Sequence, residues 1–456
     1  MTDTDWGDAK FFIDDESVSL TQDECFLFTV EPSRPYGDLK KSDTYLGMDP
    51  RITNLPFGTV ADSTAQNMLN KTFSKDTTQF QLPVVNGVQQ KFAYKALYIL
   101  ETTSVNRWGR NGSGSGASGK SKLQSDVIVV DENGKVDDLS PVQWDWLDIS
   151  RISVYPIDEQ LLTVQGGTFT TIVSAHKVTE GYIYRGMLIM RSNVLIKNVK
   201  HYLKGEEKQF DGLNSYYVQY KKDSNGNIVK DADGKPIIVK EEIHAKFGSP
   251  YHAFFELRNC MNVKLDGCVF SNHLQVYNKG NETDSTSPYD YYAEYCVNIT
   301  IDNCTCAHTN WYTVEYYKGL YGIDDFPKIP LPVDEDGIMD KQRWGTTGTN
   351  YVKNLNLYNS SINRIDAHKG TYNLTVKNSV LGHKGIAAVG FGVMLIEDST
   401  IRSDHFINLR VDFGCAWYGD VIVNNCTWDL GKNYAPRFFN VSYQPNPKFP
   451  YGYDII

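Results

Sequence analysis

Apolar and polar residues alternate in a nine-residue pattern that recurs from residue 161 to residue 428. Apolar residues hold the second and fourth places, a turn-forming Asn, Asp or Gly usually holds the sixth, a small residue commonly follows, and an apolar one usually ends the pattern. Alternation of this kind is typical of a β-strand with one buried face, and the turn-former tolerates a tight corner. Eight copies begin at residues 161, 193, 262, 298, 354, 373, 393 and 420.

The spacing of the copies predicts the fold. Successive copies begin 32, 69, 36, 56, 19, 20 and 27 residues apart, and the three shortest intervals suit one coil of a solenoid made of short strands. A parallel β-helix needs the same pattern at every rung, because equivalent residues stack about 4.8 Å apart, whereas an antiparallel sandwich does not. We therefore predict an all-β protein in which residues 151–456 form a right-handed parallel β-helix.

The seventh and ninth places predict the inside of each coil. The seventh places should stack in a narrow corner and are Gly167, Val199, Cys268, Cys304, Ser360, Ser379, Ser399 and Cys426. The ninth places should line the core and include Phe169, Phe270, Cys306, Ile362, Leu381, Ile401 and Trp428.

The long intervals and the N-terminal third fall outside the pattern. We expect insertions near 210–250 and 310–345; the first contains Asn225-Gly226 and Asp233-Gly234, pairs typical of hairpin turns. Insertions of this length commonly border a binding site. Residues 1–150 predict a β-rich cap or attachment region, since the end of a solenoid must be covered.

Composition and charge narrow the partners. The chain has 29 Tyr, 21 Phe and 8 Trp, which favour strands, and a formal charge of -10. This charge disfavours nucleic acid, because a polyanion would approach a negative protein. It also modestly disfavours a strongly anionic substrate, unless Arg and Lys concentrate in one groove or a bound cation intervenes. A sugar remains compatible with it.

Targeting and metal signals are weak. No apolar run approaches the roughly 18 residues of a membrane span, so we expect no membrane insertion. The start, MTDTDWGDAKFF, lacks the features of a signal peptide and predicts synthesis in the cytoplasm, with secretion as the alternative if a leader has been removed. The eight cysteines include no CxxC pair, so we expect no zinc site, no disulfide framework and no cofactor.

The segment LTVQGGTF and the recurring N-apolar-x-apolar-x-[ND]-[CS] words resemble the pectin-lyase-like superfamily of right-handed parallel β-helices, over about residues 161–430. The resemblance implies contact with carbohydrate, because this fold occurs in polysaccharide lyases, polygalacturonase-type hydrolases and bacteriophage tailspikes. Tailspikes match best a chain without a leader and with free cysteines, and they imply a virion location, a homotrimer and tail-protein contacts through residues 1–150. The signature words of polygalacturonases and pectate lyases are absent in their expected form, so no catalytic residue is carried over.

The segment NRIDAHKG at 363–370 is the candidate site. Arg364, Asp366 and His368 follow one another at steps of two, so their side chains point to the same side of a strand. If the pattern sets the register, the residues two places beyond each copy form a polar column that includes His308, Arg364 and His383. A ladder of hydrogen bonds on a solvent-facing sheet would give the same column without any ligand.

Two reactions are compatible with these residues. Hydrolysis of a glycosidic bond needs two carboxylates, about 5 Å apart for retention or up to about 9.5 Å for inversion, and Asp366 with Asp404 is the candidate pair. A lyase would use His368 or Lys369 as the base and a cation such as Arg364 to stabilise the enolate. The substrate-binding candidates are His308, Arg343, Trp344, His383, Lys384, His405, Arg410, Asp412 and Tyr418.

Three classes of function follow from the sequence. The first is a tailspike-like protein that binds and depolymerises a bacterial surface polysaccharide. The second is a free, secreted polysaccharide lyase or glycoside hydrolase. The third is a structural or receptor-binding virion protein without catalysis. The long insertions favour a binding surface, because ordering them has an entropic cost and adds nothing to the stack.

Overall fold

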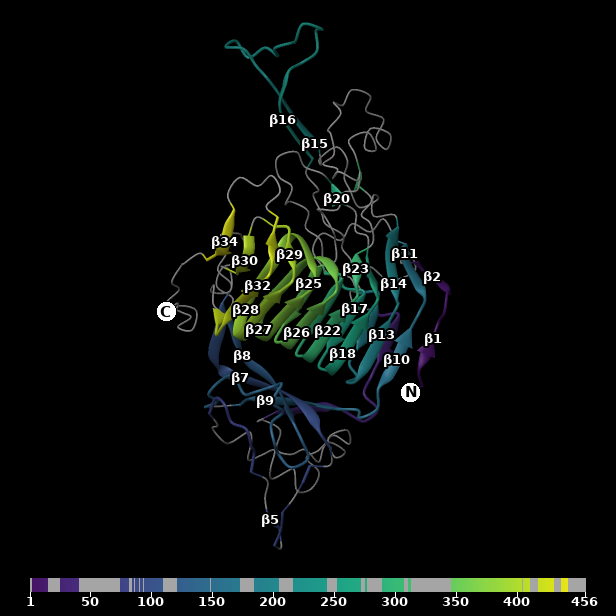
Figure 1. Cartoon of the computed structure of the whole chain (residues 1–456), viewed down its shortest axis with the longest axis vertical. Helices are drawn as coiled ribbons and strands as arrows, with labels where there is room; N and C mark the ends of the chain where they lie inside the picture. Colours follow the sequence, from purple (N-terminus) through teal and green to yellow (C-terminus); the bar gives the residue numbers. More distant parts are fainter. Residues whose placement is uncertain are drawn as a thin grey trace.

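Every regular element that the structure describes is a β-strand. The computed structural model describes residues 2–14, 25–40, 74–81, 84–85, 87–89, 91–92, 94–109, 121–147, 149–172, 184–204, 216–243, 252–271, 275–276, 289–306, 311–312, 346–403, 405–410, 417–429 and 436–441. Most strands belong to one winding parallel sheet, so the predicted all-β parallel solenoid is confirmed (Figure 1).

Each coil of the solenoid contributes one strand, or one part of a longer strand, to each of three faces. The chain passes through them in the order A, B, C. Face A contains β1 (Thr4–Asp5), β10 (Leu162–Gln165), β13 (Val194–Lys197), β18 (Met261–Asp266), β22 (Val297–Asp302), β26 (Lys353–Tyr358), the last parts of β27 (Ser361–Lys377) and β28 (Val380–Glu397), and β32 (Val421–Asn424). Face B contains β2 (Lys10–Asp14), β11 (Thr168–Ile172), β14 (Lys200–Lys204), β19 (Val269–Phe270), β23 (Thr305–Cys306), the first parts of β27 and β28, β29 (Thr400–Ile401) and β33 (Thr427–Trp428).

Face C carries the strands that matter for function. It contains β3 (Phe28–Val30), β12 (Met187–Ile189), β17 (Phe255–Arg258), β21 (Tyr291–Glu294), β25 (Thr346–Asn350), the middle parts of β27 and β28, β30 (His405–Leu409) and β34 (Arg437–Asn440). All pairings within the three faces are parallel, as a solenoid requires.

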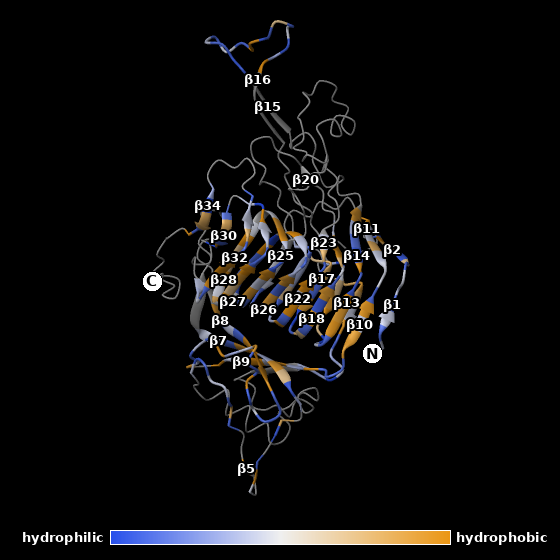
Figure 2. Ribbon diagram, in the orientation of Figure 1, coloured by the Kyte–Doolittle hydropathy of each residue, from blue (hydrophilic) through white to orange (hydrophobic). Residues whose placement is uncertain are grey.

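The predicted stacking of the eight pattern copies is confirmed on face A. Their second places pair in register from one coil to the next and form one column: Leu162, Val194, Val263, Ile299, Leu355, Leu374, Met394 and Val421. Alternate residues of these strands point inward, so apolar and polar side chains alternate along face A (Figure 2). The predicted core positions Phe169, Phe270, Ile362, Leu381 and Ile401 are fully buried.

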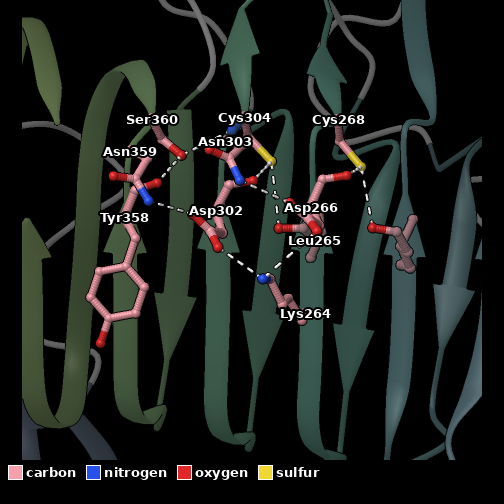
Figure 3. Close-up of polar contacts among 11 residues, drawn as sticks. Lys264, Leu265, Asp266, Cys268, Asp302, Asn303, Cys304, Tyr358, Asn359 and Ser360 are labelled. Atoms are coloured by element: carbon pink, nitrogen blue, oxygen red, sulfur yellow. Dashed lines mark hydrogen bonds and ion pairs between the residues drawn. The ribbon is translucent and has the colours of Figure 1, made fainter. Parts of the chain in front are cut away.

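The corner between faces A and B is narrow, as the seventh places predict. Asn303 and Asn359 turn the chain there with φ of 53° and 47°. Small residues stack beneath them, and the backbone N–H of Ser360 donates to the Ser379 hydroxyl at 3.2 Å. In the same way Ser379 N–H donates to the Ser399 hydroxyl at 3.1 Å. Figure 3 shows the neighbouring rungs, where Asn359 donates to Asp302 of the coil before it.

The solenoid begins before residue 151, where the sequence placed its start. Strands β1, β2 and β3 pair with β10, β11 and β12, so the described residues 4–14 and 25–30 belong to the first coil of the solenoid. The chain between β3 and β10 is an insertion in that coil. It carries an antiparallel sheet in the order β4 (Gly37–Lys40), β9 (Arg151–Pro156), β7 (Ala96–Gly109), β8 (Ser121–Val130), and a hairpin of β5 (Val84–Val85) and β6 (Val88–Gln89).

The antiparallel sheet packs against the corner between faces C and A, where its apolar residues contact Met261, Val297 and Val389 of the solenoid. A buried ion pair crosses this contact: Lys353 Nζ lies 2.7 Å from Asp126 Oδ1, and both side chains are at most 2% exposed. Burial removes both charges from water and so disfavours the charged form of each group more than their attraction favours it. As a result, the pKa of Asp126 is raised and that of Lys353 is lowered.

The long insertions between β11 and β25 all leave the coil between faces B and C. One carries the strands β15 (Tyr216–Tyr220) and β16 (Ile238–Ile243), which project from the coil (Figure 1). Both predicted turns are confirmed, since Gly226 and Gly234 have φ of 85° and 78° and donate back to Asp223 and Asp231. A further pair, β20 (Gln275–Val276) with β24 (Trp311–Tyr312), joins two other insertions. Residues 313–345 of the second predicted insertion lie outside the described residues.

Candidate functional site

The register of face C places Asp366 in an outward-facing column. Strand pairing aligns Glu256, Tyr292, Gly348 and Asp366 on successive coils. The residues just before them, such as Tyr291 and Ile365, belong to the buried core. Because neighbouring residues of a strand point to opposite sides, the column faces away from the core. The long insertions leave at the edge where these strands begin.

The Asp366 carboxylate is almost completely buried, at 1% exposure, although it faces outward. Its Oδ2 lies 2.8 Å from Arg364 Nη2, 3.2 Å from His368 Nε2, and 3.2 Å from the hydroxyl of Tyr289, which donates to it. Arg410 donates to the other oxygen, Oδ1. Four residues that the sequence singled out, Arg364, Asp366, His368 and Arg410, thus lie together, and Tyr289 joins them.

The charges of this cluster set its chemistry. Burial alone would raise the pKa of the Asp366 carboxyl, but Arg364, His368 and Arg410 outweigh it and hold that pKa well below its usual range. Burial lowers the pKa of His368, with attraction to Asp366 acting in the opposite direction. His368 is therefore neutral at neutral pH, and the two guanidiniums leave the cluster with a net positive charge.

The exposed side of the cluster presents its cations and its imidazole. The Arg364, His368 and Arg410 side chains are 25%, 16% and 12% exposed, against 2% for Asp366. A buried carboxylate that accepts from two guanidiniums holds no proton at neutral pH, which disfavours Asp366 as a general acid. The geometry instead favours a positioning role, in which Asp366 fixes the arginines and orients His368.

Tyr289 is the residue that sequence reasoning missed. Its hydroxyl lies 2.8 Å from His368 Nε2. Its ring covers Gly348, where a Cβ atom would lie 2.5 Å from the ring carbons, so glycine is required for this approach. One signal was present: the triplet SPY occurs at 249–251 and again at 287–289, each time shortly before a strand of face C. That recurrence marks the edge of the face independently of the nine-residue pattern.

The predicted column of Arg364 with His383 is wrong. Ile362 pairs with Leu381, but Arg364 pairs with Gly385, because the chain of β28 is two residues longer than that of β27 between these points. His383 and Lys384 lie in the extra length. Two rungs beyond Asp366, the register places Asn408.

The other predicted site residues are spread over several places. His405 begins β30 and pairs in register with Arg437. Tyr418 stacks on Phe391 at 5.3 Å, and Phe391 packs edge-on against Trp144 of the N-terminal insertion at 5.0 Å, so the described contacts of Tyr418 are packing contacts near that insertion. The candidates outside the described residues are His308, Arg343, Trp344, Asp404 and Asp412.

Comparisons with known proteins do not assign a family. No family model matches the sequence, and no curated protein is similar to it. Within the described ranges, no three His, Cys, Asp or Glu side chains are grouped as metal ligands. The same ranges contain no helix with the length and apolarity needed to cross a membrane. The six cysteines that can be assessed there are thiols, with Cys260 and Cys296 Sγ atoms 3.6 Å apart.

Proposed function

We propose that this protein binds an acidic polysaccharide along face C and depolymerises it by β-elimination at the Asp366 cluster. One observation carries the proposal: a buried carboxylate holds two partly exposed arginines beside a neutral histidine and a tyrosine hydroxyl. The concentration of positive charge there removes the objection that the overall charge of -10 raised against an anionic substrate.

The proposed chemistry assigns a task to each group. A lyase removes the proton beside the carboxylate of a uronic acid and expels the glycosidic oxygen, which leaves a carbon–carbon double bond. Arg364 and Arg410 would neutralise the substrate carboxylate and the charge that develops on it. His368 would accept the proton at Nδ1, because its Nε2–H faces the ionised Asp366 carboxylate and the Tyr289 hydroxyl. Asp366 would hold the arginines without reacting.

A search for activity tests the proposal directly. The purified protein is incubated with hyaluronate, polygalacturonate, alginate and acidic capsular polysaccharides. The expected result is shortening of one of them, with the ultraviolet absorbance of an unsaturated product. We expect His368→Ala to reduce the rate by about two orders of magnitude or more, the usual contribution of general acid–base catalysis.

The control is Arg151→Met, which removes a partly exposed partner of Glu101 on the N-terminal sheet, outside face C, and it should leave the rate unchanged. Shortening without the absorbance would identify a hydrolase and refute β-elimination. Full activity in His368→Ala would remove the cluster from catalysis.

The biological setting belongs to the same proposal. We infer a tailspike-like virion protein, made in the cytoplasm, that recognises a bacterial surface polysaccharide and attaches to tail proteins through residues 1–150. A homotrimer is expected in that case, whereas a free secreted enzyme would be a monomer. Light scattering on the purified protein distinguishes the two. Binding of the polysaccharide without any shortening would favour a receptor-binding protein.

A further inference from the structure

A second buried carboxylate lies in the same outward column as Asp366. Glu256 is separated from Asp366 by Tyr292 and Gly348, which makes three rungs, or about 14 Å at the spacing of parallel strands. Its side chain is completely buried. Burying a charge without a compensating gain is unfavourable, so a second such carboxylate on one face calls for a reason.

The partners of Glu256 repeat the arrangement at Asp366. Glu256 Oε1 lies 2.9 Å from Arg258 Nε, and Oε2 lies 3.2 Å from His252 Nδ1. The Arg258 guanidinium also lies over the rings of Tyr184 and Phe26, at 5.3 and 5.6 Å from their centroids. The carboxylate and the two rings fix its position, while 24% of the side chain stays exposed.

The surface between the two clusters is aromatic. The rings of Tyr289 and Tyr292 stack at 5.7 Å, and His252 packs edge-on against both of them. The two tyrosine rings are partly exposed and can carry the apolar faces of neutral sugars, whereas the His252 side chain is only 3% exposed.

Acidic side chains accompany these rings. Glu294 is partly exposed and is in register with Arg258 one rung closer to Asp366, whereas Asp290, just before β21, is buried. The face is therefore cationic at two places and acidic between them, so a negatively charged sugar would be repelled from the middle.

We propose that face C selects a polysaccharide whose acidic sugars are separated by neutral ones, with one acidic group at Arg364 and Arg410 and the next at Arg258. This inference rests on the proposed function and specifies its substrate class. Arg258 is a specificity-determining residue in this scheme, since it binds a sugar remote from the reacting bond. Glu256 positions Arg258 as Asp366 positions its own arginines.

Oligosaccharide binding, measured by calorimetry, tests the charge spacing. The probes are a hyaluronate hexasaccharide, in which acidic and neutral sugars alternate, a galacturonate hexasaccharide, in which every sugar is acidic, and a hyaluronate disaccharide, which is too short to reach both clusters. Wild-type protein should bind the hyaluronate hexasaccharide about ten-fold more tightly than either other probe, the effect of about one charge-assisted contact.

The variant Arg258→Met should lose that ten-fold advantage and leave disaccharide binding unchanged. Arg258→Met leaves the buried Glu256 carboxylate without its arginine. The double variant Glu256→Gln with Arg258→Gln is therefore measured in parallel, and it should show the same loss. Arg151→Met is again the matched control and should bind as wild type does.

The outcomes separate the two proposals. If the wild type binds both hexasaccharides equally, or if the double variant keeps the advantage, the selection at Arg258 is refuted while the proposed function stands. If the wild type binds none of the probes and shortens none of the polysaccharides in the activity panel, both proposals fail.

Discussion

The corner between faces A and B repeats nearly the same residues from coil to coil, whereas the outward side of face C does not. At the corner, successive coils use nearly the same residue for the same purpose: the hydroxyls of Ser360, Ser379 and Ser399 each donate to the backbone carbonyl two residues earlier. On face C, successive coils place Glu256, Tyr292, Gly348 and Asp366 in one column. Repetition therefore marks the positions that hold the solenoid together, and departure from repetition marks the positions available for a ligand.

Among the variants considered, Asp366→Asn should lower the unfolding free energy most. It leaves Arg364 and Arg410 facing each other without the charge between them, and breaking a buried ion pair typically costs about 3–5 kcal/mol. Urea unfolding measures the loss. Asp302→Asn is the matched change at the corner, where the carboxylate contacts Lys264 at 2.8 Å, and it should cost about 0–1 kcal/mol. Equal losses would contradict the distinction between the two regions.

The pH dependence of Asp366→Asn sharpens the same contrast. The native protein holds the pKa of Asp366 below its unfolded value, so ionisation stabilises the fold above the usual carboxyl pKa, and this stability is lost as the pH falls below that value. The difference in unfolding free energy between wild type and variant should be constant near pH 7 and shrink between about pH 4 and pH 2. Parallel urea titrations at each pH check this. A difference that grows on acidification would mean that Asp366 is buried as the neutral acid.

Breaking the corner itself should have an intermediate effect. Ser379→Ala leaves the Ser360 N–H without its acceptor in a buried place, which costs about 1–3 kcal/mol. The comparison is Thr170→Ala on face B, a half-exposed position where a change of about 0.5 kcal/mol or less is expected. Thermal unfolding of both variants provides the measurement. A loss in Ser379→Ala no larger than in Thr170→Ala would show that the corner ladder does not stabilise the coil.

The repeated positions could be predicted from sequence because each coil restates them. The second, seventh and ninth places of one copy align with the same places of the next copy. Once the eight copies are aligned on face A, all three columns follow. The same reasoning failed on face C between Ile362 and Arg364, because β28 is longer there than β27 and nothing in the pattern reports the difference. A one-dimensional repeat carries register only as far as the repeat extends.

Contacts between distant parts of the chain were also beyond the pattern. The first coil uses Phe11 and Phe28, which occur outside any copy of the pattern and yet pack on the core. Lys353 comes directly before the copy of the pattern that begins at Asn354, and its partner Asp126 comes from the N-terminal insertion. Arg410 and Tyr289 reach Asp366 from other coils. Side chains of this kind are fixed by tertiary packing, and no local periodicity encodes them.

The smallest expected effect on stability separates positioning from packing at the site. Tyr289→Phe keeps the ring over Gly348 but removes the hydroxyl that contacts Asp366 at 3.2 Å and His368 at 2.8 Å. The loss should be about 0.5–1.5 kcal/mol, that of one hydrogen bond. Gly348→Ala keeps the hydroxyl and instead displaces the ring, at a larger cost of about 1–3 kcal/mol. If the hydroxyl holds the His368 ring in position to take the proton, Tyr289→Phe lowers kcat on an acidic polysaccharide with KM little changed, although its loss of stability is small. If the ring only packs, Gly348→Ala is the more damaging change to both stability and kcat. The outward column of face C would then have a structural role at Gly348.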